Sequence, residues 1–480
     1  MNVIHIIMDT LKRSYLEPYG SKWCKTPNLQ RFAEKSVVFE RAYCASFPCM
    51  PARRDFMTGN FEFPFRGWGP LEESDRTITQ ILKDSKTVTG LVTDHYHLFR
   101  EGSGNYHFDF TAWDFIRGIE GDRVYSDPED ELDIVFQCVP ERIAENHRKY
   151  YLKYKHIKMQ NPEDWFSPRT FKSASEWVER NKGHKSFYLM IDSFPPHEPF
   201  DPPPGYAEMY DKDYKGDRLI TPVYKPWPGH YSENEIQNIK ALYAGNITHV
   251  DKWFGSFIDR LEKQGLLENT MIIVTTDHGT YTGDHGWTGK LGTYLYDCIC
   301  HIPAIIYHPE IAPRKETAIV QNTDIVPTIL EALGVRHDIK MHGSSIMPVL
   351  RKEKEKIHDY AHSGFFGRQH IINDGKYALH LGHDMSKPLY WYGYANSYFV
   401  GVGSLCPVEN GRRKVNTAEK IQKQKRYPDE PALFDLEADP DQHINLIDSA
   451  LDVKKRFIKE LERWCIEINA PQEYIERLIV

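Results

Sequence analysis

Five apolar runs recur along the chain and predict the strands of a sheet. They occupy residues 2–8, 86–92, 186–192, 270–276 and 302–307. The first, NVIHIIM, and the fourth, TMIIVTT, are apolar at nearly every position instead of alternating with polar residues. A strand has this pattern when both of its faces are buried, as in a parallel sheet. The pattern therefore predicts an α/β fold.

Helical patterns occupy much of the chain between and after these runs. Ser232 and Glu235 form a capping-box pattern, which opens a long amphipathic helix that Gly265 ends. Further helical segments are predicted at residues 77–83, 125–185, 324–330 and 449–466. Alternation of strands with helices is typical of open, mostly parallel sheets.

The length of 480 residues suits a large domain followed by a small one. Residues 1–360 hold all five apolar runs and are the predicted catalytic domain, while residues 361–480 form the predicted C-terminal subdomain. Residues 201–230 are rich in proline, tyrosine and aspartate and have little periodicity. We expect this segment to be a loop over the site that influences substrate choice.

Polar residues suited to binding stand at the ends of four predicted strands. Asp9 follows the first run, Thr93 the second, and Asp277 with His278 the fourth, while the third run leads into a proline-rich loop that contains His197. In open α/β sheets, ligands bind just beyond the carboxyl ends of the strands. We therefore expect these side chains to converge on one anion and one metal ion.

Residues 46–59, with the sequence SFPCMPARRDFMTG, predict a short helix with chemistry at its start. Pro51 suits the first turn of a helix, and Gly59 suits its end. Cys49 then lies at the helix N-terminus, where free backbone N–H groups favour negative charge. Arg53 follows one turn later and can point back to the same anion.

Composition narrows the class of partner and the compartment. A net charge of −8 argues against a general nucleic-acid partner. The eight cysteines form no dense framework, and Cys298 with Cys300 makes a C-x-C pair without a second pair at zinc-finger spacing. Because no basic segment precedes an apolar one and no long apolar stretch occurs, we expect no membrane association and a cytoplasmic protein with reduced thiols. A signal removed during cloning would leave the same sequence.

Several of these motifs together resemble the sulfatase family of the alkaline phosphatase superfamily. The C-x-P-x-R run at residues 49–53 resembles the sulfatase signature, although Met50 and Ala52 depart from its commonest form. The runs PHEPF at residues 196–200 and DHG at residues 277–279 also match the family. The resemblance implies a three-layer α/β/α large domain with a smaller C-terminal α+β subdomain. It also implies that Cys49 is oxidised to formylglycine, whose hydrate is the nucleophile.

The resemblance implies a set of metal ligands. These are Asp9, Asp277, His278 and the modified Cys49, with Thr10 as an extra ligand where most sulfatases have a second aspartate. An oxygen-rich set of this kind suits a hard cation, so we expect calcium, with manganese or magnesium as alternatives.

A second group of residues is expected to act on the substrate. In this comparison Arg53 orients the nucleophile, Lys290 binds an oxygen of the transferred group, and His197 faces the leaving group. The family's usual lysine beside the sulfate is absent after the second strand. Thr93 stands there instead, as in the phosphonate monoester hydrolase branch, with His95 or His97 available to replace the lost charge.

The predicted function is metal-dependent hydrolysis of a sulfate ester, an aryl or sugar sulfate. The expected partners are this small anion, a formylglycine-generating enzyme during maturation, and further copies of the chain in a homo-oligomer. One alternative is a phosphonate monoester or phosphodiester hydrolase with the same nucleophile, which Thr93 and Asp94 support. Another is a non-catalytic anion-binding relative, which would require an unmodified Cys49.

Overall fold

The computed structural model describes residues 1–100, 105–122, 124, 157, 159–393, 408–409, 412–415 and 428–480. Most of the helical prediction for residues 125–185 lies outside the described residues. Within the described part, helix α6 (Phe166–Asn181) confirms it.

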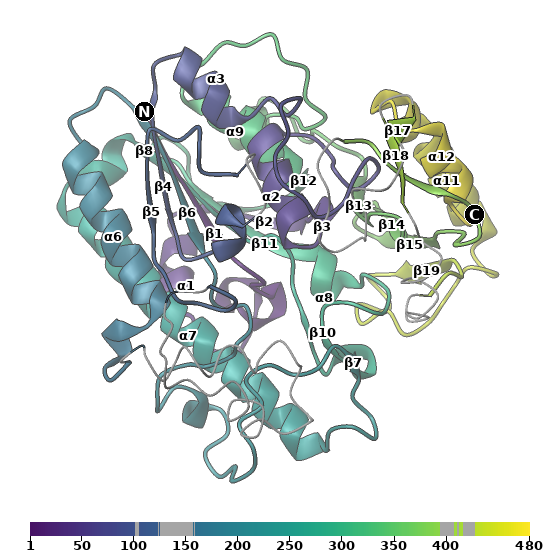
Figure 1. The fold of residues 1–480 in the computed structure, drawn as a ribbon, viewed down its shortest axis with the longest axis horizontal. Helices are drawn as coiled ribbons and strands as arrows, with labels where there is room; N and C mark the ends of the chain where they lie inside the picture. Colours follow the sequence, from purple (N-terminus) through teal and green to yellow (C-terminus); the bar gives the residue numbers. More distant parts are fainter. Residues whose placement is uncertain are drawn as a thin grey trace.

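An eight-stranded sheet forms the centre of the fold, as Figure 1 shows. Its strand order is β12-β2-β11-β8-β1-β6-β4-β5. Strands β8, β1, β6, β4 and β5 all run parallel to one another, whereas β11 runs antiparallel to both β8 and β2. The strands are β1 (Asn2–Met8), β2 (Val37–Tyr43), β4 (Val88–Thr93), β5 (Ala112–Phe115), β6 (Phe187–Ser193), β8 (Thr270–Thr275), β11 (His301–Tyr307) and β12 (Arg314–Gln321). The predicted mostly parallel sheet is confirmed.

Each face of this sheet packs against its own layer of helices, because successive side chains of a strand point to opposite faces. In β1, Val3 and Ile7 contribute to one hydrophobic cluster, while Ile4 and Ile6 contribute to the other. The first cluster contains residues of α2 (Cys49–Thr58), α3 (Ile78–Asp84), α9 (Ile325–Ala332) and α10 (Met347–Leu350). The second contains residues of α1 (Pro27–Ala33), α6 and α7 (Glu233–Lys263). The structure is therefore a three-layer α/β/α sandwich.

The local signals for the longest helix are confirmed. Ser232 is the N-cap of α7: its hydroxyl accepts a hydrogen bond from the Glu235 amide, and the Glu235 side chain accepts one from the Ser232 amide. Gly265, directly after the C-cap, has a φ of 67°, in the left-handed region where glycine has no steric penalty. These signals set the two ends of α7, and its apolar residues pack it on one face of the sheet.

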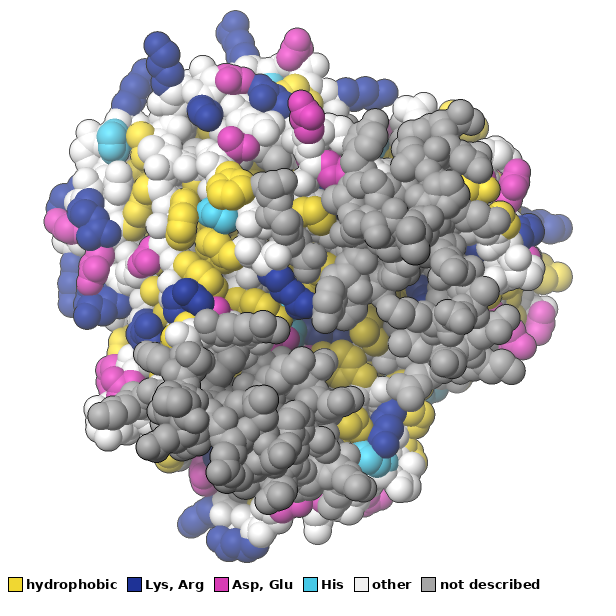
Figure 2. Space-filling model, in the orientation of Figure 1, with side chains coloured by type: hydrophobic (Ala, Val, Ile, Leu, Met, Phe, Trp, Pro, Cys, Tyr) yellow, Lys and Arg dark blue, Asp and Glu magenta, His cyan; other side chains and the backbone are white. Residues whose placement is uncertain are grey.

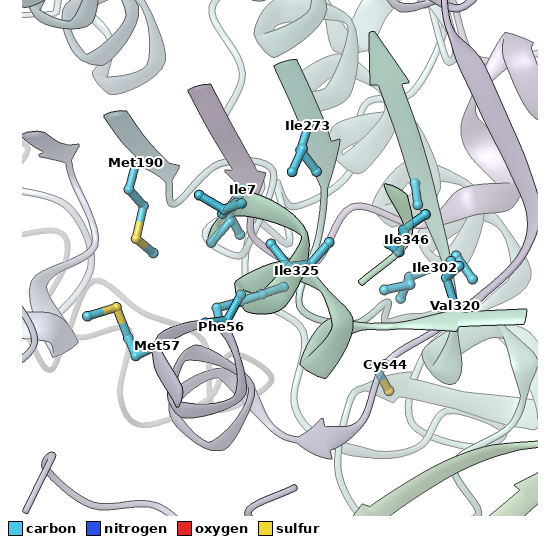
Figure 3. Close-up of a cluster of buried hydrophobic side chains, with 14 of the residues drawn as sticks. Ile7, Cys44, Phe56, Met57, Met190, Ile273, Ile302, Val320, Ile325 and Ile346 are labelled. Carbon is cyan, nitrogen blue, oxygen red and sulfur yellow. The ribbon is translucent and has the colours of Figure 1, made fainter. Parts of the chain in front are cut away.

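Helix α2 is anchored to the opposite face by its apolar side. Figure 3 shows Phe56 and Met57 of α2 beneath Met190, Ile7 and Ile273, which project from three neighbouring strands. All five side chains are 2% exposed or less. Burying an aliphatic or aromatic side chain of this size contributes about 1.5–3 kcal/mol. This packing holds the N-terminus of α2 against the end of the sheet.

A second, five-stranded sheet has the order β19-β15-β14-β13-β3. It consists of β3 (Ser46–Phe47), β13 (Ala361–Phe365), β14 (Gln369–Asn373), β15 (Tyr377–Gly382) and β19 (Ala432–Asp435). Helix α11 (Leu451–Glu467) packs on it and confirms the predicted helix at residues 449–466 to within two residues. It is not the final helix as expected, because α12 (Gln472–Arg477) follows. The boundary between residues 360 and 361 stays a prediction. Because β3 directly precedes α2, this sheet also supports the segment that bears Cys49.

The remaining elements are short. One three-stranded sheet contains β7 (Lys225–Pro226), β9 (Tyr281–Thr282) and β10 (Trp287–Gly289), and another contains β16 (Leu389–Trp391), β17 (Val408–Glu409) and β18 (Arg412–Val415). Helix α8 (Asp297–Cys300) precedes β11. Within the described residues, no helix combines the length and apolar character needed to cross a bilayer. Both acidic and basic side chains are scattered over the face in Figure 2.

Candidate active site

The four polar strand ends meet at one edge of the central sheet, as the sequence predicts. Strands β8, β1, β6 and β4 are consecutive neighbours and all run parallel, so their carboxyl ends lie side by side. Asp277, Asp9 and Thr93 follow or end three of these strands, and the loop after β6 carries His197. Asp9, Thr93, Asp277 and His278 are fully buried, and His197 is nearly so.

Cys49 is the first residue of α2 and is 3% exposed. Its Sγ lies 3.3 Å from His278 Nε2 and 3.8 Å from Lys290 Nζ. Burial, followed by the charge of Asp9, raises the pKa of the thiol well above its ordinary value. The thiolate is the nucleophilic form of cysteine. In the absence of a cation, an unmodified Cys49 is therefore mostly a neutral thiol at neutral pH.

Arg53 lies one turn after Cys49 and binds three aspartates from three strand ends. Its guanidinium contacts Asp9 Oδ2 at 2.8 Å, Asp192 Oδ1 at 2.8 Å and Asp277. Burial alone would raise the pKa of Asp9 and of Asp277, but the Arg53 charge, together with other neighbouring charges and hydrogen bonds, outweighs it and lowers both. Both side chains are therefore held as carboxylates in a fully buried position.

Four side chains form a set of donors that suits a divalent cation. Asp9, Cys49, Asp277 and His278 each offer one atom, and these atoms lie within 4.8 Å of one another. His278 Nδ1 donates to the Gly279 carbonyl at 2.8 Å, which leaves the Nε2 lone pair directed toward Cys49. Two carboxylates, an imidazole nitrogen and the position of Cys49 are chemically suited to such an ion. The ion itself stays unidentified by this geometry.

Thr10 lies beside this set of donors. Its hydroxyl donates to Asp9 Oδ1 at 2.5 Å and accepts from Lys290 Nζ at 3.2 Å, while its amide donates to Asp277 Oδ1 at 2.9 Å. The φ of Thr10 is 63°, a left-handed value that is unusual for a β-branched residue. Thr10 therefore links Asp9, Asp277 and Lys290, and its expected role as a metal ligand stays a prediction.

Lys290 brings a buried cation next to Cys49. It is 4% exposed and follows β10, which pairs with β7 from the predicted loop at residues 201–230. Burial would lower the pKa of its ammonium group, but Cys49 and Glu198 outweigh this and raise the pKa above its ordinary value. Lys290 is therefore a permanent positive charge at the site.

His197 and Glu198 approach the site from the loop after β6. His197 Nδ1 donates to the backbone carbonyl of Glu198 at 2.6 Å, and its ring lies against Phe194 with centroids 4.1 Å apart. The Glu198 carboxylate lies 3.7 Å from Lys290 Nζ. The hydrogen bond on Nδ1 fixes the imidazole tautomer with an unprotonated Nε2 in its neutral form.

Thr93 and His95 contact protein groups in this structure. The Thr93 hydroxyl donates to the Asp192 carbonyl at 2.7 Å and accepts from the His95 amide at 2.9 Å. His95 Nε2 lies 3.1 Å from Asp9 Oδ2. Both residues therefore belong to the same cluster as the predicted metal ligands. The expected contact of either with a bound anion stays a prediction.

Two residues of this cluster were not predicted from sequence. Asp192 comes at the end of an apolar run, as Asp9 and Asp277 do. This position in the sequence could have predicted that it lies with them beside Arg53. Glu198 is adjacent to His197 in the proline-rich loop, but sequence gives no reason to direct its side chain at Lys290.

Comparison with known proteins agrees with this geometry. The family model described as Sulfatase matches residues 1–335. The arylsulfatase of Clostridium perfringens is 23% identical over 412 residues, which cover 75% of this chain and 80% of that protein. The crystal structure of the phosphonate monoester hydrolase of Agrobacterium radiobacter superposes with a TM-score of 0.71 at 18% identity, covering 97% and 96% of the two chains.

A structure solved in complex with its substrate D-glucosamine-2-N,6-O-disulfate superposes with a TM-score of 0.68 at 19% identity. The match covers 98% of this chain and 99% of that chain. The family model matches most of the chain, and the matched range contains Asp9, Cys49, Asp277 and His278. The chain therefore belongs to the sulfatase family of the alkaline phosphatase superfamily and is a sulfuric ester hydrolase.

Proposed function

We propose that this protein is a metal-dependent sulfatase whose nucleophile is a formylglycine made from Cys49. One observation supports the proposal above the others. Cys49, at the start of α2, is enclosed by the donors Asp9, Asp277 and His278 on one side and by Lys290 on the other. A nucleophile, a cation site and a positive charge for the substrate are thereby combined within a few ångströms.

The chemistry divides among these residues according to their positions. Asp9, Asp277 and His278 would hold the cation together with residue 49, where the cation and the aldehyde hydrate supply an activated hydroxyl for attack on sulfur. Arg53 fixes the orientation of the three aspartates that surround it. Lys290 balances negative charge on the sulfate oxygens, which is a large term where water is excluded. In its imidazolium form, His197 would donate the Nε2 proton to the departing alcohol oxygen.

The state of the Cys49 thiol supports conversion to an aldehyde. In the absence of a cation, a thiol whose pKa is raised by burial and by Asp9 is mostly protonated at neutral pH. An aldehyde hydrate at the same place provides oxygen in place of sulfur, and hard cations prefer oxygen ligands. Calcium, with manganese or magnesium as alternatives, is therefore the proposed cation.

The substrate class is an aryl or sugar sulfate. A relative of the same fold was solved with a sulfated glucosamine, and an arylsulfatase is among the similar sequences. Hydrolysis of phosphonate monoesters or phosphodiesters is a second candidate function. The end of β4 supports it. Thr93 is hydrogen bonded to Asp192 there and His95 contacts Asp9, so neither residue replaces the positive charge of the lysine that most sulfatases have at this place.

Mass spectrometry of residue 49 tests the proposal directly. Cleavage after Arg41 and Arg53 yields one peptide that contains both Cys44 and Cys49. In protein co-expressed with a formylglycine-generating enzyme, we expect Cys49 to lose H₂S and gain O and to react with an aldehyde probe. Cys44 in the same peptide is the internal control and should keep its thiol. A plain thiol at Cys49 in fully active protein would overturn the mechanism.

Turnover of three substrates separates the two candidate functions. We expect an aryl sulfate to be hydrolysed with a higher kcat/KM than an aryl phosphodiester or a phenylphosphonate ester. The reverse order would favour the phosphonate or phosphodiester function with the same nucleophile.

A further inference from the structure

Glu198 has a carboxylate that the proposed reaction does not use. The residue is 4% exposed, and neither of its side-chain oxygens accepts a hydrogen bond from the residues that the structure describes. Oε2 lies 3.7 Å from Lys290 Nζ and 3.4 Å from His197 Nδ1. His197 Nδ1 already donates to the backbone carbonyl of Glu198 at 2.6 Å. Because a buried carboxylate without hydrogen bonds is unfavourable, its position points to a functional reason.

The position of Glu198 matters because it alters the charge that a substrate meets. Within the described residues, the cluster holds two fully buried or nearly buried cations, Arg53 and Lys290. Its carboxylates are Asp9, Asp192 and Asp277, which Arg53 contacts, and Glu198, which it does not. A divalent cation would bring these charges to balance. Without Glu198, the same site would carry one net positive charge.

From this arrangement we infer that Glu198 is a specificity-determining residue that favours monoanionic esters and excludes dianionic phosphate monoesters. Sulfate esters, phosphonate monoesters and phosphodiesters carry one negative charge, and a phosphate monoester carries two above its second pKa. The second charge on such a substrate would be repelled by Glu198 in a site from which water is excluded. The inference rests on the proposed function because it assumes that Lys290 and His197 face the substrate.

Kinetics on two substrates of the same shape test the inference. The experiment measures kcat/KM for 4-nitrophenyl sulfate and 4-nitrophenyl phosphate at pH 8, in the native enzyme and in Glu198→Gln. We expect the phosphate-to-sulfate ratio to rise roughly tenfold or more when the charge is removed. The ratio should stay near the native value in Glu198→Asp, which keeps the charge. It should also be unchanged in the control Glu233→Gln, which removes an exposed charge at the start of α7.

A binding measurement gives a second readout that does not depend on turnover. Protein made without the formylglycine-generating enzyme keeps the Cys49 thiol and can be loaded with metal. Calorimetry then compares methyl sulfate with methyl phosphate, which differ by one charge. We expect Glu198→Gln to gain affinity for methyl phosphate by roughly tenfold, with the metal content per chain unchanged.

The two hypotheses fail in different ways. If Glu198→Gln leaves both the kinetic and the binding ratios within about twofold of native, the charge filter is wrong. A loss confined to amino-sugar sulfates would also overturn it, because Glu198 would then bind a substrate ammonium group. If the native enzyme hydrolyses phosphodiesters and no sulfate ester, the proposed function fails, while the methyl sulfate and methyl phosphate comparison still tests Glu198.

Discussion

Arg53 and Arg54 are neighbours on α2, both fully buried, and they lie in two different clusters of charge. Adjacent helical residues point about 100° apart. Arg53 reaches Asp9, Asp192 and Asp277 at the strand ends. Arg54 instead contacts Glu62 and Asp75, away from those ends, and donates to the Gly67 and Pro70 carbonyls.

The difference between the two clusters shows what identifies an active site. In the Arg54 cluster, Arg66 also pairs with Glu62, Glu72 and Asp75, and two backbone carbonyls accept hydrogen bonds from Arg54. The Arg53 cluster is bordered by Cys49, His278 and Lys290, and its atoms are spaced for a cation. Buried charge therefore occurs in both places. Only the cluster at the carboxyl ends of the strands has the donors for chemistry.

The largest expected loss of activity follows a substitution in the Arg53 cluster. Asp277→Ala should abolish metal binding and lower kcat/KM by at least roughly a thousandfold, because a carboxylate of the donor set is lost. Arg53 keeps Asp9 and Asp192, so the fold should persist. Metal per chain by mass spectrometry, kcat/KM and circular dichroism check this. Native metal content with near-native activity would refute the assignment.

The matching change in the other cluster should affect stability instead of chemistry. Arg54→Leu leaves Glu62 and Asp75 buried beside Arg66 alone, and breaking a buried ion pair in this way costs about 3–5 kcal/mol of the free energy of unfolding. Urea denaturation measures this loss. The folded fraction should retain native metal content and kcat/KM per molecule. A large loss of kcat in fully folded Arg54→Leu would remove the distinction between the clusters.

A third change separates substrate binding from metal binding within the Arg53 cluster. Lys290→Ala should lower kcat/KM by roughly a hundredfold, the size typical of losing one charge-stabilising donor. Metal content should stay native, since Lys290 is outside the set of donors. Lys290→Arg is the matched control that keeps the charge. Loss of metal in Lys290→Ala would instead indicate that Lys290 maintains the donor set through Thr10.

The smallest effect concerns Asp94, a buried carboxyl for which no ion pair occurs within the described residues. Burial, with the charge of Asp192 as a further cause, raises the pKa of Asp94 to about 8, although a hydrogen bond from the Phe194 amide opposes this. Between the unfolded pKa near 4 and the folded value, the unfolded chain loses its proton first, so native stability falls as pH rises.

Asp94→Asn removes this ionisation. We expect the variant to gain stability relative to the native chain as the pH rises from 4 to 8, and to show little gain at pH 4. Urea unfolding at several pH values measures the difference. If the stability difference between Asp94→Asn and the native chain were the same at every pH, Asp94 would not have the raised pKa. A carboxylate would then remain ionised at this buried position without an arginine partner.

Much of the fold and of this site could be predicted from the sequence because strand ends in a parallel sheet share an edge. The runs that end at Asp9, Thr93 and Asp277 predicted the edge before any pairing was known. The order of the strands could not be predicted in the same way. The apolar pattern of residues 302–307 predicted a strand but not its antiparallel direction, because buried strands of either direction have similar patterns.

Contacts between distant segments account for what was missed. Asp192 contacts an arginine 139 positions earlier, and no local pattern encodes that distance. Glu198 gained its importance only from the position of Lys290. Likewise, β3 joins a sheet whose other strands begin at Ala361, so two residues next to Cys49 belong to a structure made mostly by the end of the chain.

The place of β1 in the sheet has a consequence for the order of events during synthesis. β1 is synthesised before its partners β6 and β8. Asn2 therefore cannot pair with Thr270 until the chain has been made that far. Such distant pairings form slowly because the loop between them must close first. Until His278 and Lys290 are synthesised, Cys49 lacks the two side chains that lie against its sulfur in the finished fold, where it is 3% exposed. If Cys49 is modified as proposed, the sheet order leaves a period before folding is complete in which the modifying enzyme can reach it.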